Sequence, residues 1–485
     1  MKDLKPLTGM LFALLLATAS NSLAATKGQD LLVKFAPGHK AQMRMMLTSF
    51  AKQGESAEAL TDSWVRVQVS NLRAKSTLLS LQNNPAIEYV QPNYKIKLLE
   101  NYQIQDALRR AAFARGLAAD LQVQAKPDNP EIPGAPQQGL GADPDFSKQW
   151  GMNDIGAKEA WNQTMGSPDM IVAVIDTGVD YTHEDLLPNL WRNSKEIAGN
   201  GKDDDGNGYV DDMIGWDFVT NDNKPFDLAV DPAQLLTSGG NPGHGTHCAG
   251  NVAAKGGNAL GIAGVAPNVK IMSLRFISDK GEGTSADAIK AIKYAVDNGA
   301  KVLSNSWGSE GEDPKEDAEN KALREIITYA QTKGALFIAA AGNGHQGVGY
   351  DNDTDKAPGY PASYDHENII SVAAIDVKNE LGSFSNWGIK SVDIGAPGVD
   401  VYSTVVGGSY NNYVIDIGPF QVTWDGTSMA APHVAGAAAL YWSAHPEKDW
   451  KAVKAAVLDS AKAIPALQGK VVSEGKLDVR ALMSH

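Results

Sequence analysis

Hydrophobic residues follow one pattern before residue 143 of this chain and another after it. From residue 30 to 96, apolar and polar positions alternate in short runs that two helix-like segments interrupt. The strand-like runs are DLLVKF, SWVRVQV and AIEYVQP, and the helix-like segments are HKAQMRMMLTSFAKQ and AKSTLLSLQNN. This order, strand–helix–strand and then helix–strand, predicts a small α+β unit over residues 25–98.

After residue 143 the apolar runs become continuous. They are MIVAVID, VKIMSLRF, KVLSNSWG, ALFIAAAGN and NIISVAAID, and helix-like segments such as 285–298 and 315–333 lie among them. Runs without alternation are typical of parallel strands that helices cover on both faces. We therefore predict an α/β domain over residues 143–485, in which helices sandwich a mainly parallel sheet.

Residues 99–142 separate these two regions. A helical pattern near 106–121 precedes the Pro- and Gly-rich stretch KPDNPEIPGAPQQGLGADPD. This composition indicates an exposed linker, and we place the domain boundary near Asp143.

The first 24 residues have the pattern of a secretory signal peptide. Lys2 and Lys5 precede an apolar stretch from residue 7 to 19, and small residues stand at Ser22 and Ala24. The apolar stretch is shorter than the roughly 20 residues that span a bilayer. We expect cleavage after Ala24 and secretion, without a membrane-spanning segment.

Charge and cysteine content narrow the possibilities further. The formal net charge of -14 disfavours nucleic acid as a partner. Because Cys248 is the only cysteine, no intrachain disulfide stabilises the exported protein. Its stability must come from a large core, from bound metal ions or from a high barrier to unfolding.

Polar residues at the ends of the apolar runs suggest a reaction site. Asp176, Ser306 and Asn343 each follow such a run, and the carboxyl ends of parallel strands meet at one edge of a sheet. His244 in GHGTHCAG and Ser428 in GTSMAAP add a base and a nucleophile. A serine hydroxyl needs an imidazole to remove its proton, and the imidazole needs a carboxylate to orient it. We predict these roles for Ser428, His244 and Asp176.

The stretch WDGTSMAAPHVAG predicts a helix that starts beside Ser428. A serine at a helix start places its own N–H and the positive end of the helix dipole near a developing oxyanion. Asn343 would be a second donor. Pro432 is expected in the first helical turn, where its missing N–H costs no hydrogen bond.

Each of these residues also has a plainer explanation. Taken singly, Asp176 would be a turn residue, His244 a loop histidine and Ser428 a helix N-cap. Two neighbours of the histidine are expected to be structural: His247 as a packed, hydrogen-bonded side chain, because no HExxH spacing exists, and Cys248 as a small buried hydrophobe.

The acidic stretch DDDGNGYVDD has the oxygen spacing of an EF-hand calcium loop. Asp203, Asp205 and Asn207 stand at positions 1, 3 and 5, and Asp211 stands at position 9. Position 12 is an isoleucine instead of glutamate, so either Asp212 replaces the missing ligand or calcium binds more weakly. The alternative is a solvated acidic turn without Ca²⁺.

The motifs DTGVD, HGTHCAG, AAAGN and GTSMAAPHVAG, in this order, resemble those of the subtilisin family of serine peptidases from about Phe146 to the C-terminus. The resemblance implies a monomeric serine endopeptidase that hydrolyses polypeptide substrates. It also implies the following residues: Ser306, Trp307 and Gly308 as a groove edge that binds extended peptide, Gly342 and Gly359 beside the pocket for the P1 side chain, and Asp185 and Asn258 at a second calcium site.

The resemblance further implies that residues 25–98 are a ferredoxin-like inhibitory prosegment of an autoprocessed preproenzyme, with its last strand in the groove. A parallel sheet with long-range pairing folds slowly, which gives a folding template a physical purpose. An independent binding domain is the alternative for this unit. A narrowly specific processing peptidase and a catalytically silent binding protein are the alternatives for the whole chain.

Overall fold

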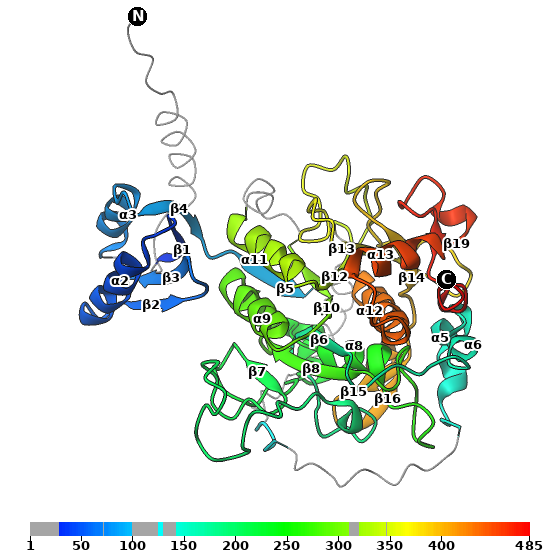
Figure 1. The fold of residues 1–485 in the computed structure, drawn as a ribbon. Coiled ribbons are helices and arrows are strands. Elements are labelled where there is room, and N and C mark those ends of the chain that lie inside the picture. The colour runs from blue at the N-terminus through cyan, green and yellow to red at the C-terminus, as the bar shows by residue number, and fades with distance from the viewer. Residues whose placement is uncertain (1–28, 71, 99–124, 130–141, 310–319, 346) are drawn as a thin grey trace, which may run out of the picture. The chain divides into compact units, whose positions relative to one another are not determined.

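The computed structural model describes residues 29–70, 72–98, 125–129, 142–309, 320–345 and 347–485 (Figure 1). It divides into two compact units, of which the first ends at Asn93 and the second begins at Tyr94. The predicted signal peptide, the helical pattern near 106–121 and most of the linker lie outside the described residues.

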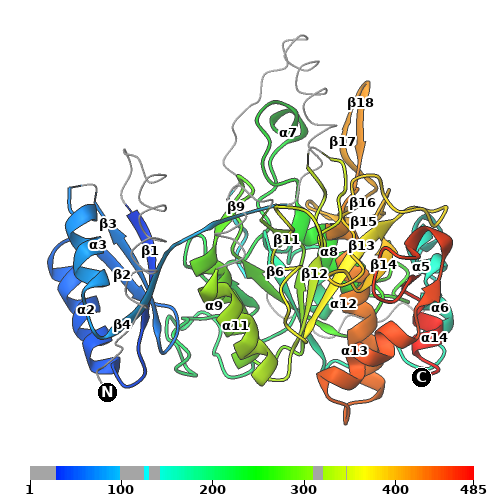
Figure 2. The ribbon, with the colours of Figure 1, turned by 90° about the horizontal axis from the view of Figure 1, so that it is seen from above.

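The first unit is an antiparallel sheet with two helices. Its sheet has the order β2-β3-β1-β4. Alternate residues of β1 and β3, such as Leu31 and Val67, form one core with Met43 and Leu81 from the helices, so both helices cover the same face (Figure 2). Its elements are β1 (Gln29–Phe35), α2 (Lys40–Lys52), β2 (Ser56–Ala59), β3 (Trp64–Val69), α3 (Ala74–Gln82) and β4 (Ile87–Pro92).

These elements match the sequence prediction with one addition. The strand β2 was not predicted because SAEA is short and contains no large apolar residue. It pairs with β3 at the edge of the sheet, where packing demands fewer apolar side chains.

The second unit is built on a nine-stranded sheet with the order β19-β20-β14-β13-β12-β10-β6-β8-β7. All neighbouring strands are parallel except β19 and β20, so the predicted fold class is confirmed. The strands are β6 (Ile171–Asp176), β7 (Gly215–Asp217), β8 (Lys270–Arg275), β10 (Val302–Asn305), β12 (Leu336–Ala340), β13 (Ile369–Ile375), β14 (Ile394–Pro397), β19 (Lys462–Ala463) and β20 (Gly475–Lys476).

Helices cover both faces of this sheet (Figure 2). On one face α8 (His244–Ala253) and α12 (Thr427–Ala444) contribute to the main core with even-numbered residues of the central strands. The other face carries α9 (Ser285–Asp297) and α11 (Lys321–Thr332). Residues 427–442 of α12 are all buried, as expected for a helix that is apolar or small on every side.

Smaller elements surround this framework. None of the helices in the described part of the chain is both long and apolar enough to cross a membrane. The remaining helices are α5 (Trp150–Asp154), α6 (Ala157–Ala160), α7 (Pro232–Ser238), α13 (Trp450–Asp459) and α14 (Val479–Leu482), and the remaining strands are β5 (Lys95–Leu98), β9 (Glu282–Thr284), β11 (Trp307–Gly308), β15 (Ser403–Val405), β16 (Ser409–Asn411), β17 (Tyr413–Ile417) and β18 (Phe420–Thr423).

Candidate active site

The structure brings Asp176 and His244 together at the carboxyl edge of the sheet. Asp176 is the last residue of β6 and His244 the first of α8. His244 Nδ1 lies 2.8 Å from Asp176 Oδ1, and both residues are buried. The close approach depends on Gly245, where a Cβ atom would lie 2.1 Å from the carbonyl oxygen of Gly178. A histidine in this geometry is fixed in orientation by the carboxylate.

Asp176 also sets the charge preference of the histidine. Burial alone lowers the pKa of His244, but the carboxylate of Asp176 outweighs it and raises this pKa well above its ordinary value. Among the described residues, His244 Nε2 has no hydrogen-bond partner. The ring is therefore held at one nitrogen and available for proton transfer at the other.

Ser428 is the second residue of α12, directly after the N-cap Gly426 and Thr427. Its hydroxyl donates to the carbonyl oxygen of Ser306 at 3.0 Å. In return, the Ser306 hydroxyl donates to the carbonyl oxygen of Ser428 at 2.9 Å. The serine that follows β10 is thus linked at two points to the start of α12.

Pro432 corrects one expectation from the sequence. The helix begins at Thr427, so Pro432 lies inside it rather than in its first turn. A residue with an N–H at this position would donate to the carbonyl of Ser428, four residues back. That carbonyl instead accepts from the Ser306 hydroxyl and from Cys248 Sγ, at 2.9 and 3.5 Å. The proline therefore frees the carbonyl of Ser428 for contacts with β10 and α8.

Asn343 follows β12 and contacts the same helix start. Its Oδ1 accepts from the N–H and from the hydroxyl of Thr427, both at 2.9 Å. These two donors identify the oxygen end of the amide, so the NH₂ group is at the other end. A Cβ atom at Gly426 would lie 3.3 Å from Asn343 Nδ2. The amide donor therefore lies beside the glycine that begins the Ser428 helix.

Comparison with known proteins identifies the family to which this chain belongs. The family model described as Subtilase family matches residues 167–475, which include Asp176, His244, Asn343 and Ser428. The chain belongs to the subtilase family of serine peptidases.

Individual relatives agree with this assignment. The subtilase is 35% identical to "Thermophilic serine proteinase" of Bacillus sp. (strain AK1) over 77% of this chain and 67% of the relative. It is 38% identical to "Thermitase" of Thermoactinomyces vulgaris over 61% of this chain and 84% of the relative. It is also 28% identical to "Halolysin-like extracellular serine protease Nep" of Natrialba magadii, over 88% and 65% of the two chains.

The structural interpretation of the two neighbours of the histidine is confirmed. His247 is fully buried, stacks on Trp424 and has Nε2 3.0 Å from the Val401 carbonyl. Burial lowers the pKa of His247 to about 3, so its ring is neutral at physiological pH. Cys248 is also buried, and burial raises the pKa of its thiol. Both side chains are therefore part of the packing around His244.

A strand from earlier in the chain lies along the predicted groove edge. The subtilase places β5 antiparallel between β9 and β11, with Leu98 opposite Trp307 and Lys97 opposite Gly308. Ile96 and Leu98 are buried. The predicted strand AIEYVQP corresponds to β4, which pairs with β1 and not with this edge. The occupant is the next strand, whose short alternating sequence KIKL we did not predict as a separate element.

The two glycines assigned to the P1 pocket, Gly342 and Gly359, are each in close contact with other parts of the protein. A Cβ atom at Gly359 would lie 2.8 Å from the carbonyl oxygen of Ala341, and one at Gly342 would lie 2.4 Å from Asn386 Nδ2. Gly342 also has a φ of 113°, which side chains rarely adopt. Neither position admits a side chain, because atoms of the protein already lie where the Cβ would stand.

The acidic loop brings together a different set of carboxylates from the one predicted. Glu196, Asp203 and Asp205 offer oxygen atoms that all lie within 4.8 Å of one another. No described Lys or Arg forms a salt bridge with any of the three. Like charges this close favour a bound cation, and carboxylate oxygens are ligands that Ca²⁺ prefers. Sequence reasoning missed Glu196 because it lies before the EF-hand pattern.

The other predicted ligands of this loop accept or donate hydrogen bonds within the protein. Asp211 accepts from the N–H groups of Asn200 and Gly201. Asp212 is buried and accepts from the Tyr294 hydroxyl and from the amides of Asn193 and Asn207, the last at 2.9 Å. Burial raises the pKa of Asp212, although these hydrogen bonds act against it. The amide nitrogen of Asn207 thus faces Asp212, and its Oδ1 accepts from the Tyr209 N–H at 2.8 Å.

The second predicted calcium site also forms a cluster. Asp185 is fully buried, accepts from Asn258 Nδ2 at 2.8 Å and from the Ile262 N–H at 3.1 Å, and has its pKa raised by burial to about 6. Asp143 accepts from the N–H groups of Gly257 and Asn258 in the same loop. Since Asn258 turns its nitrogen toward Asp185, ion binding there would require its amide to turn over. Asp143 was not among the predicted ligands, because its only signal in the sequence is its place at the domain boundary.

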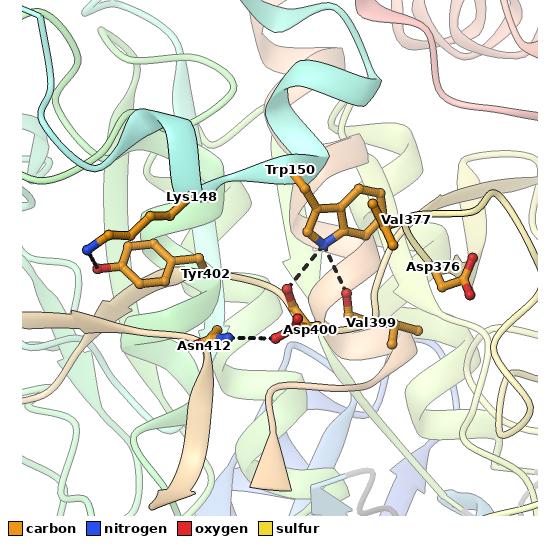
Figure 3. A pocket seen from close by; sticks show the side chains of 8 residues that line it. All are labelled: Lys148, Trp150, Asp376, Val377, Val399, Asp400, Tyr402 and Asn412. Carbon is orange, nitrogen blue, oxygen red and sulfur yellow. Dashed lines mark hydrogen bonds between the residues drawn. The ribbon is translucent and has the colours of Figure 1, made fainter. Parts of the chain in front are cut away.

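A separate open pocket of about 530 Å³ lies beside α5 (Figure 3). Its polar groups are largely paired: the Trp150 indole donates to the carbonyls of Val399 and Asp400, and Asn412 donates to the Asp400 carboxylate. None of the predicted site residues lines this pocket. It therefore belongs to a different part of the surface.

Proposed function

We propose that this subtilase is a secreted, calcium-stabilised serine endopeptidase that is made as an autoprocessed preproenzyme. The observation that carries the proposal is the Asp176–His244 pair, 2.8 Å apart, beside a helix that starts with Thr427 and Ser428. Secretion is supported by the signal-peptide pattern of residues 1–24 and by a relative whose name describes it as extracellular.

The proposed reaction follows from these positions. His244 Nε2 removes the proton from the Ser428 hydroxyl as its oxygen attacks the peptide carbonyl, and Asp176 stabilises the resulting imidazolium. The Ser428 N–H and the Asn343 NH₂ group donate to the oxyanion. His244 then protonates the leaving amine, and water activated by the same ring hydrolyses the acyl-enzyme.

The position of β5 between β9 and β11 supports extended polypeptide as the substrate. Backbone pairing with β9 and β11 binds any sequence in this register, and side-chain pockets select among them. Ile96 and Leu98 are buried in this register, which favours apolar residues at alternate substrate positions. Gly344, the residue after Asn343, carries no charge, so we expect a large apolar or uncharged P1 side chain.

The same register suggests where the chain cuts itself. Leu98 is opposite Trp307, and Ser306, the preceding residue on the enzyme's edge, accepts the Ser428 hydroxyl. A polypeptide in this register presents to Ser428 the residue that follows the one opposite Trp307. In this chain that residue is Leu99, which lies outside the described residues. We expect the first self-cleavage between Leu99 and Glu100, which releases residues 25–98 as part of the prosegment.

The experiment compares the full chain with its Ser428→Ala variant by intact mass and N-terminal sequencing. The wild type is expected to acquire a new N-terminus at Glu100. The variant is expected to lose only the signal peptide, residues 1–24. Equal processing of both chains would contradict autoprocessing. Wild-type chain that cleaves no peptide at all would favour the catalytically silent binding protein.

The prosegment role has its own test. A peptide of residues 25–98 is expected to inhibit the mature enzyme and to speed refolding of the denatured peptidase domain. Refolding at the same rate without the peptide, together with no inhibition, would favour an independent binding domain.

Calcium is proposed at the group formed by Glu196, Asp203 and Asp205. The residues fit the ion because they provide only oxygen ligands and no described cationic side chain pairs with them. Asp185, Asn258 and Asp143 are the proposed second site. Bound calcium would stabilise both loops without taking part in the reaction.

Broad digestion and narrow processing differ in what they cleave. Digestion of a mixed peptide pool by the purified enzyme separates the two. Cleavage at many sequences with apolar P1 residues is expected because Gly344, next to Asn343, carries no charge. Cleavage of a single sequence would indicate a processing peptidase.

A further inference from the structure

A buried carboxylate outside the proposed triad connects two of its members. Asp227 is fully buried and forms no salt bridge with a described Lys or Arg. Its Oδ1 accepts from the Thr177 hydroxyl at 2.8 Å and from Asn241 Nδ2 at 2.7 Å. Its Oδ2 accepts from the N–H and the hydroxyl of Thr246, at 2.8 and 2.6 Å.

Surrounding hydrogen bonds fix the direction of these contacts. The Thr177 hydroxyl accepts from the Gly245 N–H at 2.8 Å, so its own proton is directed to Asp227. The Thr246 hydroxyl likewise accepts from the Asp180 N–H at 2.9 Å. Each hydroxyl has one proton to donate, and both protons are therefore assigned to Asp227.

The amide of Asn241 is oriented in the same way. Its Oδ1 accepts from the N–H groups of Gly243 and His244, at 2.9 and 3.0 Å, which assigns Nδ2 to the side that faces Asp227. Among the described residues, Asp227 thus has four donors as hydrogen-bond partners. Burial raises the pKa of Asp227, while the donors from Thr246, Asn241 and Thr177 act in the opposite direction. A carboxyl group with four donors is satisfied only as the anion.

These donors lie next to the reacting residues. Thr177 directly follows Asp176, and Thr246 is two residues after His244 in the first turn of α8. Asn241 holds the N–H of His244 itself. A negative charge at this place is also favoured by the N-terminal end of the α8 dipole. One side chain therefore ties the end of β6 to the start of α8.

We propose that Asp227 is a positioning residue of this peptidase. It holds the backbones of Asp176 and His244 in the relative position that lets their side chains pair. The proposal rests on the proposed function, because it assigns a role to Asp227 in placing the general base. It gives a role to one carboxylate of the acidic segment 217–231.

The informative substitution is Asp227→Asn. It keeps the size of the side chain but replaces one carboxylate oxygen by an NH₂ group. In either orientation of the amide, this NH₂ group faces donors: those of Thr246 on one side, or those of Thr177 and Asn241 on the other. The β6–α8 register must shift to relieve this contact. Small displacements of catalytic groups lower the rate of the chemical step more than substrate binding, by up to about 100-fold.

The experiment measures kcat, KM and the rate at which a phosphonyl fluoride inactivates the enzyme. For Asp227→Asn we expect kcat and the inactivation rate to fall together by about 10- to 100-fold, with KM within about two-fold of wild type. The Thr177→Val variant, which removes one donor, is expected to show a smaller fall with the same split.

The matched control is Asp393→Asn. Asp393 is a partly buried carboxylate that accepts from the Ser371 N–H and pairs with Lys454, away from the triad. We expect this variant to lose thermal stability while kcat and the inactivation rate stay unchanged.

The outcomes separate the two proposals. Unchanged kcat and inactivation rate in Asp227→Asn, whatever its thermal stability, would overturn the positioning role. If Asp227→Asn does not fold, unchanged rates in Thr177→Val would overturn it. A wild-type enzyme that is not labelled at Ser428 would instead overturn the proposed function, and with it the role that Asp227 has in it.

Discussion

Two regions of the molecule stabilise buried or crowded carboxylates differently. One is the edge of the sheet beside Ser428, and the other is the acidic loop around Asp203. At the catalytic edge, Asp176 is matched by His244 and Asp227 by four donors, all from the protein itself. In the acidic loop, Glu196, Asp203 and Asp205 come together without a described cationic partner. Backbone N–H groups also donate to Glu196 and Asp203, so what sets the second region apart is three carboxylates whose oxygens lie within 4.8 Å of one another. We propose that a cation stabilises them.

A third cluster shows that this chain can also neutralise acids with its own cations. Asp217 is fully buried and contacts Arg275 Nη1 at 2.8 Å and Lys126 Nζ at 2.5 Å. Lys126 also pairs with Asp222 at 3.0 Å. Although burial acts in the other direction, hydrogen bonds from Thr220, the Lys224 N–H and Lys126 hold the pKa of Asp222 below its usual range. Glu196, Asp203 and Asp205 have no such cationic partner among the described residues, although their carboxylate oxygens lie together.

This contrast teaches that changes in the two regions should have separable effects. Substitutions at the catalytic edge are expected to change the rate of the reaction and leave the calcium dependence of stability intact. Substitutions in the acidic loop are expected to do the reverse.

The largest expected effect is that of Asp176→Asn. Loss of the carboxylate removes the acceptor that orients His244, so kcat is expected to fall by about 10⁴-fold. The substitution also removes the charge that raises the pKa of His244. Because the base must be neutral, wild-type activity should fall as pH decreases through a pKa above 6.5, and in the variant this acid limb should move to lower pH. A pH–rate profile of both enzymes checks the direction, and an upward shift would contradict it.

Asn343→Leu is expected to have the next largest effect. It removes one donor to the oxyanion and should lower kcat by about 10² to 10³-fold, with KM nearly unchanged. The response of its thermal inactivation to a chelator should match that of wild type. An unchanged kcat would remove Asn343 from the reaction.

Chelation tests the acidic loop. At free calcium about 1,000 times the Kd, a bound ion stabilises the native state by about 4 kcal/mol, so a chelator should lower the temperature of thermal inactivation. Asp205→Ala should abolish most of this difference. Asp204→Asn is the control, because Asp204 is exposed and hydrogen-bonds to Ile197 and Asn200 without belonging to the three-carboxylate group. Equal inactivation with and without chelator would indicate a solvated acidic turn.

The smallest expected effect is that of Lys126→Met. This change removes a cation from a partly buried cluster and should destabilise the protein by about 1 to 3 kcal/mol, independently of calcium. The control Lys224→Met breaks a largely exposed pair with Asp128, for which about 0 to 1 kcal/mol is expected. Thermal inactivation with and without chelator measures both. A chelator-dependent effect of Lys126→Met would mean that the two acidic clusters are not independent.

The sequence predicted the framework well, because its signals are local. Continuous apolar runs identified the parallel strands, and the residues at their carboxyl ends, such as Asp176 and Asn343, were expected at one edge for that reason. The geometry then depends on contacts that no spacing encodes. Glu196 reaches Asp203 only through the fold of the loop, and Asp227 reaches Thr177 and Thr246 from a separate segment.

One error has an equally specific cause. Pro432 was expected in the first turn, but even a helix that starts at Ser428 makes it the fifth residue. The carbonyl that lacks its helical N–H donor is tolerated because Ser306 and Cys248 donate to it. The assignment of Asp211 to the ion stays a prediction, and its carboxylate accepts from the N–H groups of Asn200 and Gly201.

The central claim is that Ser428 is the nucleophile of a peptidase. The most direct measurement is to treat the purified mature enzyme with a phosphonyl fluoride and to locate the adduct by peptide mass spectrometry while following peptide hydrolysis. We predict a single adduct on Ser428 that forms in step with the loss of activity, and no adduct in the Ser428→Ala variant. An adduct elsewhere with full activity retained, or hydrolysis at the wild-type rate by Ser428→Ala, would contradict the claim.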